Sequence, residues 1–141
     1  MSLGLYLHIP YCFSKCRYCD FYSHPGERGV PDAYVEALVR ELDRFAPERP
    51  LQPDTLYFGG GTPSLLRPEQ AKRLIDAARP MPGAEITLEA NPETVTEESL
   101  AGFREAGVNR ISFGVQSARD TQLRTLGRPH TAKQARAAFA A

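Results

Sequence analysis

The segment LGLYLHIPYCFSKCRYC, residues 3–19, joins a strand pattern directly to all the cysteines of the chain. Apolar residues alternate with polar or small ones over residues 3–9, which predicts a strand that Pro10 ends. The three cysteines follow with the spacing C-x-x-x-C-x-x-C: Cys12, Cys16 and Cys19. Three thiols leave one cysteine over in any disulfide pairing, and they fall one short of a structural zinc site. They suit a [4Fe-4S] cluster whose fourth iron has no protein ligand.

The residues between the cysteines are compatible with a metal site. Lys15 and Arg17 lie in the same loop and would offset the negative charge of thiolates. Thiolates are soft ligands that favour iron–sulfur clusters, zinc or copper(I). Two other interpretations stay open: three buried structural cysteines, or a zinc site that His8 or His24 completes.

Strand and helix patterns alternate along the rest of the chain. Further strands are expected at residues 55–58, 85–89 and 110–116. Helices are expected from Pro31 or Asp32 to Pro47, from Pro68 to Pro80, from Thr96 to Gly107, and as a broken stretch from about Arg119. Strands that alternate with helices predict right-handed βαβ units and a parallel sheet, an α/β fold with four such units.

Three of the four predicted strands alternate, whereas buried parallel strands are usually continuous apolar runs. Their polar or small positions are Tyr6 and His8, then Glu85, Thr87 and Glu89, then Ser112, Gly114 and Gln116. A sheet with helices outside and polar side chains inside predicts a barrel with a lumen that holds a polar ligand. The alternative is a set of strands at an edge or facing solvent.

Each unusual motif comes directly at or after the end of a predicted strand. The cysteines follow the first strand, Gly59-Gly60-Gly61-Thr62-Pro63 follows the second, Glu89 closes the third and Gln116 closes the fourth. Parallel α/β folds bind their ligands at the carboxyl ends of the strands. We therefore expect these four features on one rim.

The side chains on this rim can recognise a polar ligand. The glycines allow close approach of the backbone, whose carbonyls can accept hydrogen bonds from an ammonium group; an ordinary tight turn is the alternative. A phosphate loop is disfavoured because no Gly-Lys-Ser/Thr ending follows. Glu89 can accept bonds from two ribose hydroxyls, or form a salt bridge with an arginine. The fork of Arg128 can bind a carboxylate, although alone Arg128 and Gln116 are more typical of structural roles.

Composition and charge narrow the class of protein. The 141 residues suffice for one domain, and 42% are hydrophobic, which is typical of a globular chain. Seventeen basic and seventeen acidic residues cancel, so nothing global points to nucleic acid. We find no apolar run long enough to cross a bilayer and no signal-peptide pattern, which predicts a cytoplasmic protein. The last stretch, residues 131–141, favours a helix without a stop signal and indicates a fragment of a longer protein.

The motifs together resemble those of the radical S-adenosylmethionine (SAM) superfamily. The cysteine spacing after a first strand and Gly-Gly-Gly-Thr-Pro after a second carry this resemblance. Four longer segments resemble the oxygen-independent coproporphyrinogen III oxidase family and its haem-chaperone branch, HemW: residues 6–12, 59–64, 89–92 and 114–117. The resemblance covers residue 3 to about residue 131. It implies that residues 1–141 are the N-terminal part of a radical SAM core domain, an incomplete TIM-like (β/α)6 barrel of which about four βα units are present.

The resemblance also implies cofactors and their ligands. Cys12, Cys16 and Cys19 would hold a [4Fe-4S] cluster whose open iron binds SAM and whose electron cleaves SAM to methionine and a 5′-deoxyadenosyl radical. Gly60, Gly61 and Thr62 resemble the segment that receives the ammonium of SAM, and Glu89 resembles a ribose ligand. The further positions that resemble SAM contacts are Tyr6, Tyr18, Gln116 and Arg128. His8 and His130 are expected to be hydrogen-bonded structural histidines.

One departure from the oxidase pattern bears on function. The decarboxylating oxidases usually carry a further cysteine two residues after the third, where this chain has Phe21 in Cys19-Asp20-Phe21. Cys-Asp-Phe is typical of the haem-chaperone branch, which implies binding of haem and its transfer to a membrane or respiratory enzyme. The alternative is the oxidase itself, which forms protoporphyrinogen IX by radical decarboxylation. Both functions imply a haem or porphyrin partner and an electron donor.

Overall fold

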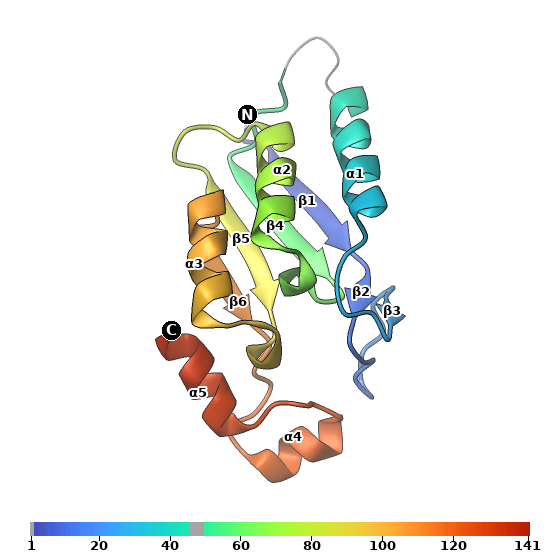
Figure 1. Ribbon diagram of the computed structural model, residues 1–141, viewed down its shortest axis with the longest axis vertical. Coiled ribbons are helices and arrows are strands. Elements are labelled where there is room, and N and C mark those ends of the chain that lie inside the picture. Colours follow the sequence, from blue (N-terminus) through green and yellow to red (C-terminus); the bar gives the residue numbers. More distant parts are fainter. Residues whose placement is uncertain (1, 46–49) are drawn as a thin grey trace.

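A four-stranded parallel sheet forms the centre of the computed structural model, which describes residues 2–45 and 50–141. The strands are β1 (Gly4–Ile9), β4 (Thr55–Gly60), β5 (Glu85–Ala90) and β6 (Arg110–Phe113), and they lie in that order across the sheet. Each strand pairs in parallel with the next, with Ile9 opposite Gly60 and Ala90 opposite Phe113. The carboxyl ends of all four strands therefore meet at one edge (Figure 1).

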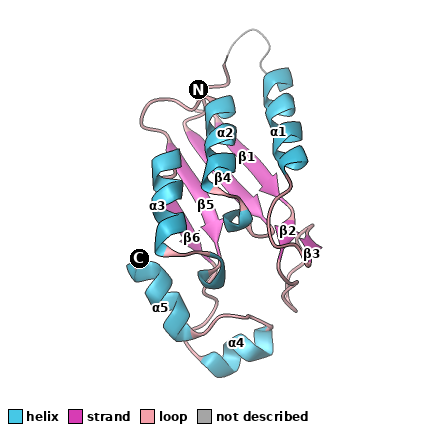
Figure 2. Cartoon of the chain, viewed as in Figure 1, coloured by secondary structure: helices cyan, strands magenta, loops and turns pink. Residues whose placement is uncertain are grey.

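Three helices cover one face of this sheet. They are α1 (Asp32–Phe45), α2 (Pro68–Ala78) and α3 (Glu97–Ala106), and α2 packs between the other two. Figure 2 shows the three helices side by side in front of the strands. The core between these layers contains fully buried apolar side chains from the sheet and the helices, among them Leu56, Phe58, Leu74, Leu88 and Phe103. This is the α/β arrangement that the alternating patterns predict.

Local signals in the sequence explain where two of these helices begin and end. Pro68 occupies the first turn of α2, where its missing N–H is not needed. The Thr96 hydroxyl accepts a hydrogen bond from the N–H of Ser99 and so caps α3. Gly107 ends α3 with a left-handed φ of 114°. The predicted end of the first helix at Pro47 lies outside the described residues.

The other face of the sheet carries the predicted polar side chains. Tyr6 is exposed, and Tyr57, Glu89 and Ser112 are half-buried, whereas their apolar neighbours in β4 and β5 are buried under the helices. Thr87 differs from the expected pattern because it is buried; its hydroxyl lies between the side chains of Glu85 and Arg110. The alternation therefore does separate a helix-covered face from an open polar face.

The fourth strand is shorter than predicted. We expected it to run to Gln116, but β6 ends at Phe113 and the chain turns sharply afterwards. The N–H of Val115 bonds to the carbonyl of Phe113, the N–H of Ser117 bonds to that of Val115, and Gln116 takes a left-handed φ of 66°. These tight turns end the strand because their backbone groups bond locally and not across the sheet.

Two short helices follow the sheet and lie beyond its carboxyl edge in Figure 1. They are α4 (Asp120–Leu126) and α5 (Ala132–Ala140), and they correspond to the predicted broken helical stretch. The segment between them, residues 127–131, passes close to the carboxyl ends of the strands through the contacts of Arg128 and His130. Within the described ranges, no helix has the length and apolar character needed to cross a membrane.

Candidate functional site

A pocket of about 300 Å³ lies at the carboxyl edge of the sheet. Its walls come from the cysteine loop, the glycine segment after β4, the end of β5, the end of β6 and the segment after α4. Ten of the eleven predicted site residues line it: Cys12, Cys16, Cys19, Tyr18, Gly60, Gly61, Thr62, Glu89, Gln116 and Arg128. The expectation that these motifs share one rim is therefore met.

Tyr6 is the predicted residue that does not line the pocket. Its ring stacks on Tyr57, with ring centres 6.1 Å apart, and its hydroxyl lies 3.0 Å from Nδ1 of His8. Tyr57 in turn donates a 2.7 Å hydrogen bond to Glu89, which does line the pocket. Burial and this bond to Glu89 raise the pKa of Tyr57, so its hydroxyl keeps its proton. Tyr6 is thus one side chain removed from the pocket.

The cysteine loop is folded against the sheet by a small parallel pair of strands, β2 (Tyr11–Cys12) and β3 (His24–Pro25). The N–H of Glu27 bonds to the carbonyl of Cys12, and the N–H of Cys19 bonds to that of Cys16, so the loop turns back on itself. All three cysteines are free thiols; one is buried and two are half-buried. Over residues 2–45 and 50–141, no three His, Cys, Asp or Glu side chains are close enough together to hold a metal ion.

The donor set and its surroundings nevertheless fit a [4Fe-4S] cluster with three protein ligands. All three thiols open into one pocket, and two of them already accept hydrogen bonds. The hydroxyl of Thr62 lies 3.5 Å from Sγ of Cys12, and the guanidinium of Arg128 lies 3.3 Å from Sγ of Cys16. The guanidinium thus places a positive charge beside a sulfur that a cluster would take as an anionic ligand.

The zinc alternative is not supported by the histidines. His8 uses both ring nitrogens elsewhere, with Tyr6 at 3.0 Å and the carbonyl of Tyr22 at 3.0 Å. His24 lies beside the Tyr22 hydroxyl, and neither histidine lines the pocket that the thiols share. The expectation that His8 is a hydrogen-bonded structural residue is confirmed.

Two of the glycines are required by close contacts. A Cβ atom at Gly61 would lie 2.7 Å from the carbonyl oxygen of Tyr11 and 2.9 Å from Sγ of Cys12. Gly60 has a φ of 118°, and a Cβ atom there would strike the ring of His8 at 2.7 Å. Glycine at these positions lets the end of β4 touch the cysteine loop, since any side chain would push the loop away.

The N–H groups of residues 60–62 in the glycine segment are all used within the protein. Gly60 donates to Oε2 of Glu89 at 3.2 Å, and Gly61 and Thr62 donate to the carbonyls of Ile9 and Tyr11, both at 2.8 Å. The backbone groups that this segment can offer to a ligand are therefore carbonyl oxygens, which suit an ammonium group.

Glu89 is held by two donors from β4. Its Oε1 accepts from the Tyr57 hydroxyl and its Oε2 accepts from the N–H of Gly60, and neither partner is an arginine. A carboxylate oxygen has more than one lone pair, so each can accept a further hydrogen bond. The side chain is thereby oriented into the pocket and retains capacity for hydroxyl groups of a ligand.

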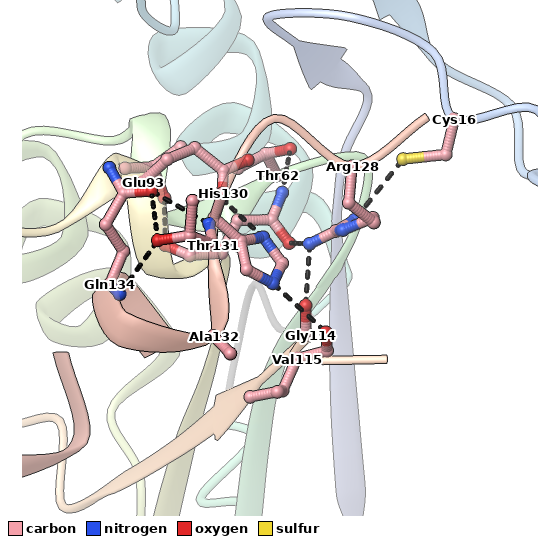
Figure 3. Close-up of polar contacts among 12 residues, drawn as sticks. Cys16, Thr62, Glu93, Gly114, Val115, Arg128, His130, Thr131, Ala132 and Gln134 are labelled. Atoms are coloured by element: carbon pink, nitrogen blue, oxygen red, sulfur yellow. Dashed lines mark hydrogen bonds and ion pairs between the residues drawn. The ribbon is translucent and has the colours of Figure 1, made fainter. Parts of the chain in front are cut away.

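Arg128 connects the sheet to the cysteine loop. It is only 8% exposed, and one terminal nitrogen donates to Oδ1 of Asn91 and to the carbonyl of Gly114, both at 2.6 Å (Figure 3). The other terminal nitrogen donates to Cys16. Burial works against the charge, but the hydrogen bond and negative charge of Cys16 outweigh it and hold the pKa of Arg128 above its usual value. Arg128 is a permanent cation beside the candidate cluster ligands.

Asn91 is a pocket residue to which the sequence assigned no role of its own. Its amide accepts from Arg128 and donates to Oγ1 of Thr62 at 3.3 Å, so it joins the ends of β4 and β5. Its position directly after a strand in a parallel sheet is the signal that could have identified it. Ser14, Lys15, Phe21, Ser112 and Phe113 also line the pocket.

Comparisons with known proteins agree with this interpretation of the site. The family model of the Radical SAM superfamily matches residues 6–141. The chain is 46% identical to "Heme chaperone HemW" of Escherichia coli, covering 96% of this chain and 38% of that protein. It is 43% identical to the mitochondrial "Radical S-adenosyl methionine domain-containing protein 1" of Bos taurus, covering 94% of this chain and 31% of that protein. The chain thus spans about a third of the length of these relatives.

Solved structures give the same fold. Coproporphyrinogen III oxidase (HemN) from Escherichia coli, described as a radical SAM enzyme, superimposes with a TM-score of 0.85 at 31% identity, covering 98% of this chain and 33% of that one. Elp3 of Methanocaldococcus infernus shares the fold with a TM-score of 0.54 at 17% identity. The expected fold class, part of a TIM-like barrel with four βα units, is confirmed. The chain belongs to the radical SAM superfamily.

Proposed function

We propose that this chain is the N-terminal part, residues 1–141, of the radical SAM core domain of a haem chaperone. In this proposal the cysteine loop holds a [4Fe-4S] cluster, the pocket binds SAM, and the whole protein binds haem and transfers it. The cluster, when bound, supplies an electron and an open iron for SAM. The superfamily implies the cluster and SAM, and the names of the relatives support haem.

The observation that carries the proposal is Phe21. It lines the pocket and is 65% exposed, at the position where the related decarboxylating oxidases usually carry a further cysteine. A phenyl ring can neither ligate metal nor carry a thiol hydrogen, so chemistry that needs a thiol at this point is closed to the chain. Its exposed apolar face is suited to contact with a planar apolar ligand.

The residues of the pocket have distinct tasks in binding SAM. The carbonyl groups of residues 60–62 would accept hydrogen bonds from its ammonium group, and Glu89 would accept bonds from its ribose hydroxyls. Arg128 would offer its charge to the carboxylate, and Gln116 and Tyr18, which both line the pocket, would contact the remainder. The Glu89 carboxylate is preoriented by Tyr57 and Gly60, which reduces the cost of ordering it on binding.

The second candidate is the oxygen-independent coproporphyrinogen III oxidase reaction. The structural agreement with HemN, at a TM-score of 0.85, favours it. Both candidates use the same cluster and SAM site, so these residues do not separate them. Phe21 is the described position at which the two patterns diverge.

Full-length protein, reconstituted anaerobically with iron and sulfide, tests the choice. We expect it to bind haem in a spectroscopic titration and to form no protoporphyrinogen IX from coproporphyrinogen III with SAM and a reductant. Efficient decarboxylation would overturn the proposal and support the oxidase. The variant Phe21→Cys distinguishes a missing thiol from other differences, since gain of decarboxylation in that variant would assign the loss to this one residue.

The proposal also includes partners and a location. The haem recipient would be a membrane or respiratory enzyme, and a separate protein would donate the electron. The location would be the cytoplasm, where thiols stay reduced and available for iron. Pull-down of haem-loaded full-length protein with membrane fractions, compared with the haem-free protein, tests the recipient.

A further inference from the structure

His130 lies behind the pocket and is completely enclosed. Its side chain is 0% exposed, and the Glu93 side chain beside it is 15% exposed. Nδ1 lies 3.1 Å from Oε2 of Glu93, and Nε2 lies 3.0 Å from the carbonyl oxygen of Val115 (Figure 3). His130 is not among the residues that line the pocket, so it acts on a ligand only through the residues it holds.

Both neighbours of the His130 ring are hydrogen-bond acceptors when Glu93 is ionised. A neutral imidazole has one N–H and can satisfy only one of them, whereas an imidazolium donates to both. Arg128 is a nearby cation whose charge interacts with Glu93. The charged groups near the ring are Glu93 from the turn after β5 and Arg128 from its own segment, and the ring bridges the Glu93 carboxylate to the Val115 carbonyl.

The residue that His130 holds precedes a strained position. Gln116 has a φ of 66°, in the left-handed region that side chains other than glycine rarely adopt, and it lines the pocket. Such a conformation is strained and persists only where surrounding contacts impose it. The carbonyl of Val115 accepts from both His130 and the N–H of Ser117, which fixes the turn on the amino-terminal side of Gln116.

Arg128 and His130 each hydrogen-bond to a backbone carbonyl of this turn. Arg128 joins Asn91 to the carbonyl of Gly114, and His130 joins Glu93 to the carbonyl of Val115. Arg128 and His130 are two positions apart in the sequence, and so are the two side chains after β5 that they contact, Asn91 and Glu93. The backbone carbonyls that they contact belong to adjacent residues. Arg128 lines the pocket directly, whereas His130 lies behind the pocket and bonds to Val115, the residue before Gln116.

We propose that His130 and Glu93 form a hydrogen-bonded positioning pair that holds the Gly114–Gln116 turn and thereby sets the SAM-facing wall of the pocket. His130 is a positioning residue, since its ring touches neither the pocket nor the cysteine loop. The proposal rests on the proposed use of this pocket for SAM.

The test measures SAM affinity of full-length, cluster-reconstituted protein by isothermal titration calorimetry. His130→Ala is expected to raise the Kd for SAM about tenfold, equivalent to about 1.4 kcal/mol, with unchanged iron content. Glu98→Gln, an exposed carboxylate on the first turn of α3, is the matched control and is expected to leave the Kd unchanged. A His130→Ala protein that binds SAM as tightly as the wild type would overturn the proposal.

A second variant decides the matter if His130→Ala does not fold. Glu93→Gln keeps the shape of the side chain and removes its charge, so a moderate rise in the Kd of about threefold is expected. An unchanged Kd for this variant, with folding intact, would count against the pair.

Nitrogen-15 spectra of the His130 ring separate this proposal from the proposed function. A ring N–H signal that exchanges slowly with water, assigned by its loss in His130→Gln, is expected, because both ring nitrogens are hydrogen-bonded in an enclosed place. A ring N–H in rapid exchange with water would overturn the pair, whether or not the protein binds SAM. Failure of the wild type to bind SAM, together with a slowly exchanging ring N–H, would overturn the proposed use of the pocket and its wall while leaving the pair itself supported.

Discussion

The two walls of the pocket are organised in different ways. The clamped wall, made of Asn91, Gly114–Gln116 and Arg128, is held by the buried side chains of Arg128 and His130, which hydrogen-bond to its backbone carbonyls. The loop wall, Cys12–Phe21, is mostly exposed, and Cys12 is its buried residue. The protein thus fixes the side that recognises a ligand through its own contacts, while the loop wall presents thiols whose final arrangement we expect metal to impose.

Removal of one thiol from the loop wall is expected to have the largest effect. Cys19→Ser in the full-length protein is expected to abolish stable cluster assembly, because two thiolates cannot hold the three protein-bound irons. Iron analysis after anaerobic reconstitution should fall from about four atoms per chain to near zero. Asp20→Asn, in the same loop but outside the pocket, should keep its iron, and a Cys19→Ser protein with full iron content would refute the assignment.

Hydrogen exchange of the Cys19→Ser and Asp20→Asn proteins tests whether the two walls depend on the cluster to different degrees. Loss of the cluster should speed exchange of amides in the loop wall, whereas amides of β5 and the Gly114–Gln116 turn should keep their protection. Equal loss of protection in both walls would mean that the clamped wall also depends on metal.

Arg128→Met removes the cation that joins the two walls. The change leaves the partly buried Asn91 amide oxygen and Gly114 carbonyl without their donor, and we expect a loss of about 3 kcal/mol in the free energy of unfolding. Denaturant unfolding of the full-length protein measures this, with Arg124→Met on the exposed surface of α4 as control. Equal stability of the two variants would show that the bridge contributes little.

Much of the fold could be predicted because its signals are local. The strand expected at residues 85–89 is observed as Glu85–Ala90, since alternation and the following Asn91-Pro92 mark it without reference to the rest of the chain. The end of β6 could not be predicted in the same way. Its turn is held by Arg128 and His130, which come 14 and 15 residues after the carbonyls they bind.

The site shows the same division between local and distant causes. The positions of the motifs after strands were enough to gather the pocket residues, because parallel strands bring their carboxyl ends together. The role of Tyr57 was missed, since its bond to Glu89 spans 32 positions of sequence and depends on the register between β4 and β5. The displacement of Tyr6 from the pocket has the same origin, because it stacks on Tyr57.

Gly61→Ala tests the contact between the glycine segment and the loop wall. The added Cβ atom would meet the Tyr11 carbonyl oxygen and Cys12 Sγ inside 3.0 Å, so the loop must move away. We expect a loss of about 2 kcal/mol in unfolding free energy and lower iron incorporation. Gly29→Ala, where the nearest atom lies 4.0 Å away, is the control and should behave like the wild type.

The smallest effect is expected from Thr62→Val, which keeps the shape of the side chain but removes its hydroxyl. This hydroxyl donates to Cys12 in the loop wall and accepts from Asn91 in the clamped wall. Loss of these bonds should cost about 1 kcal/mol in unfolding free energy. Thr121→Val on the exposed side of α4 serves as comparison, and an equal response in both would argue against the bridging role.

The missing side chains of the glycine segment also fix how β1 is aligned with β4. The spaces at Gly59, Gly60 and Gly61 are filled in turn by Tyr6, His8 and Cys12. A slip of one residue would turn Tyr6 and His8 to the opposite face and shift the thiols by about 3.3 Å along the sheet. The three successive glycines therefore fix the position of the cysteines relative to the sheet edge before any metal is bound.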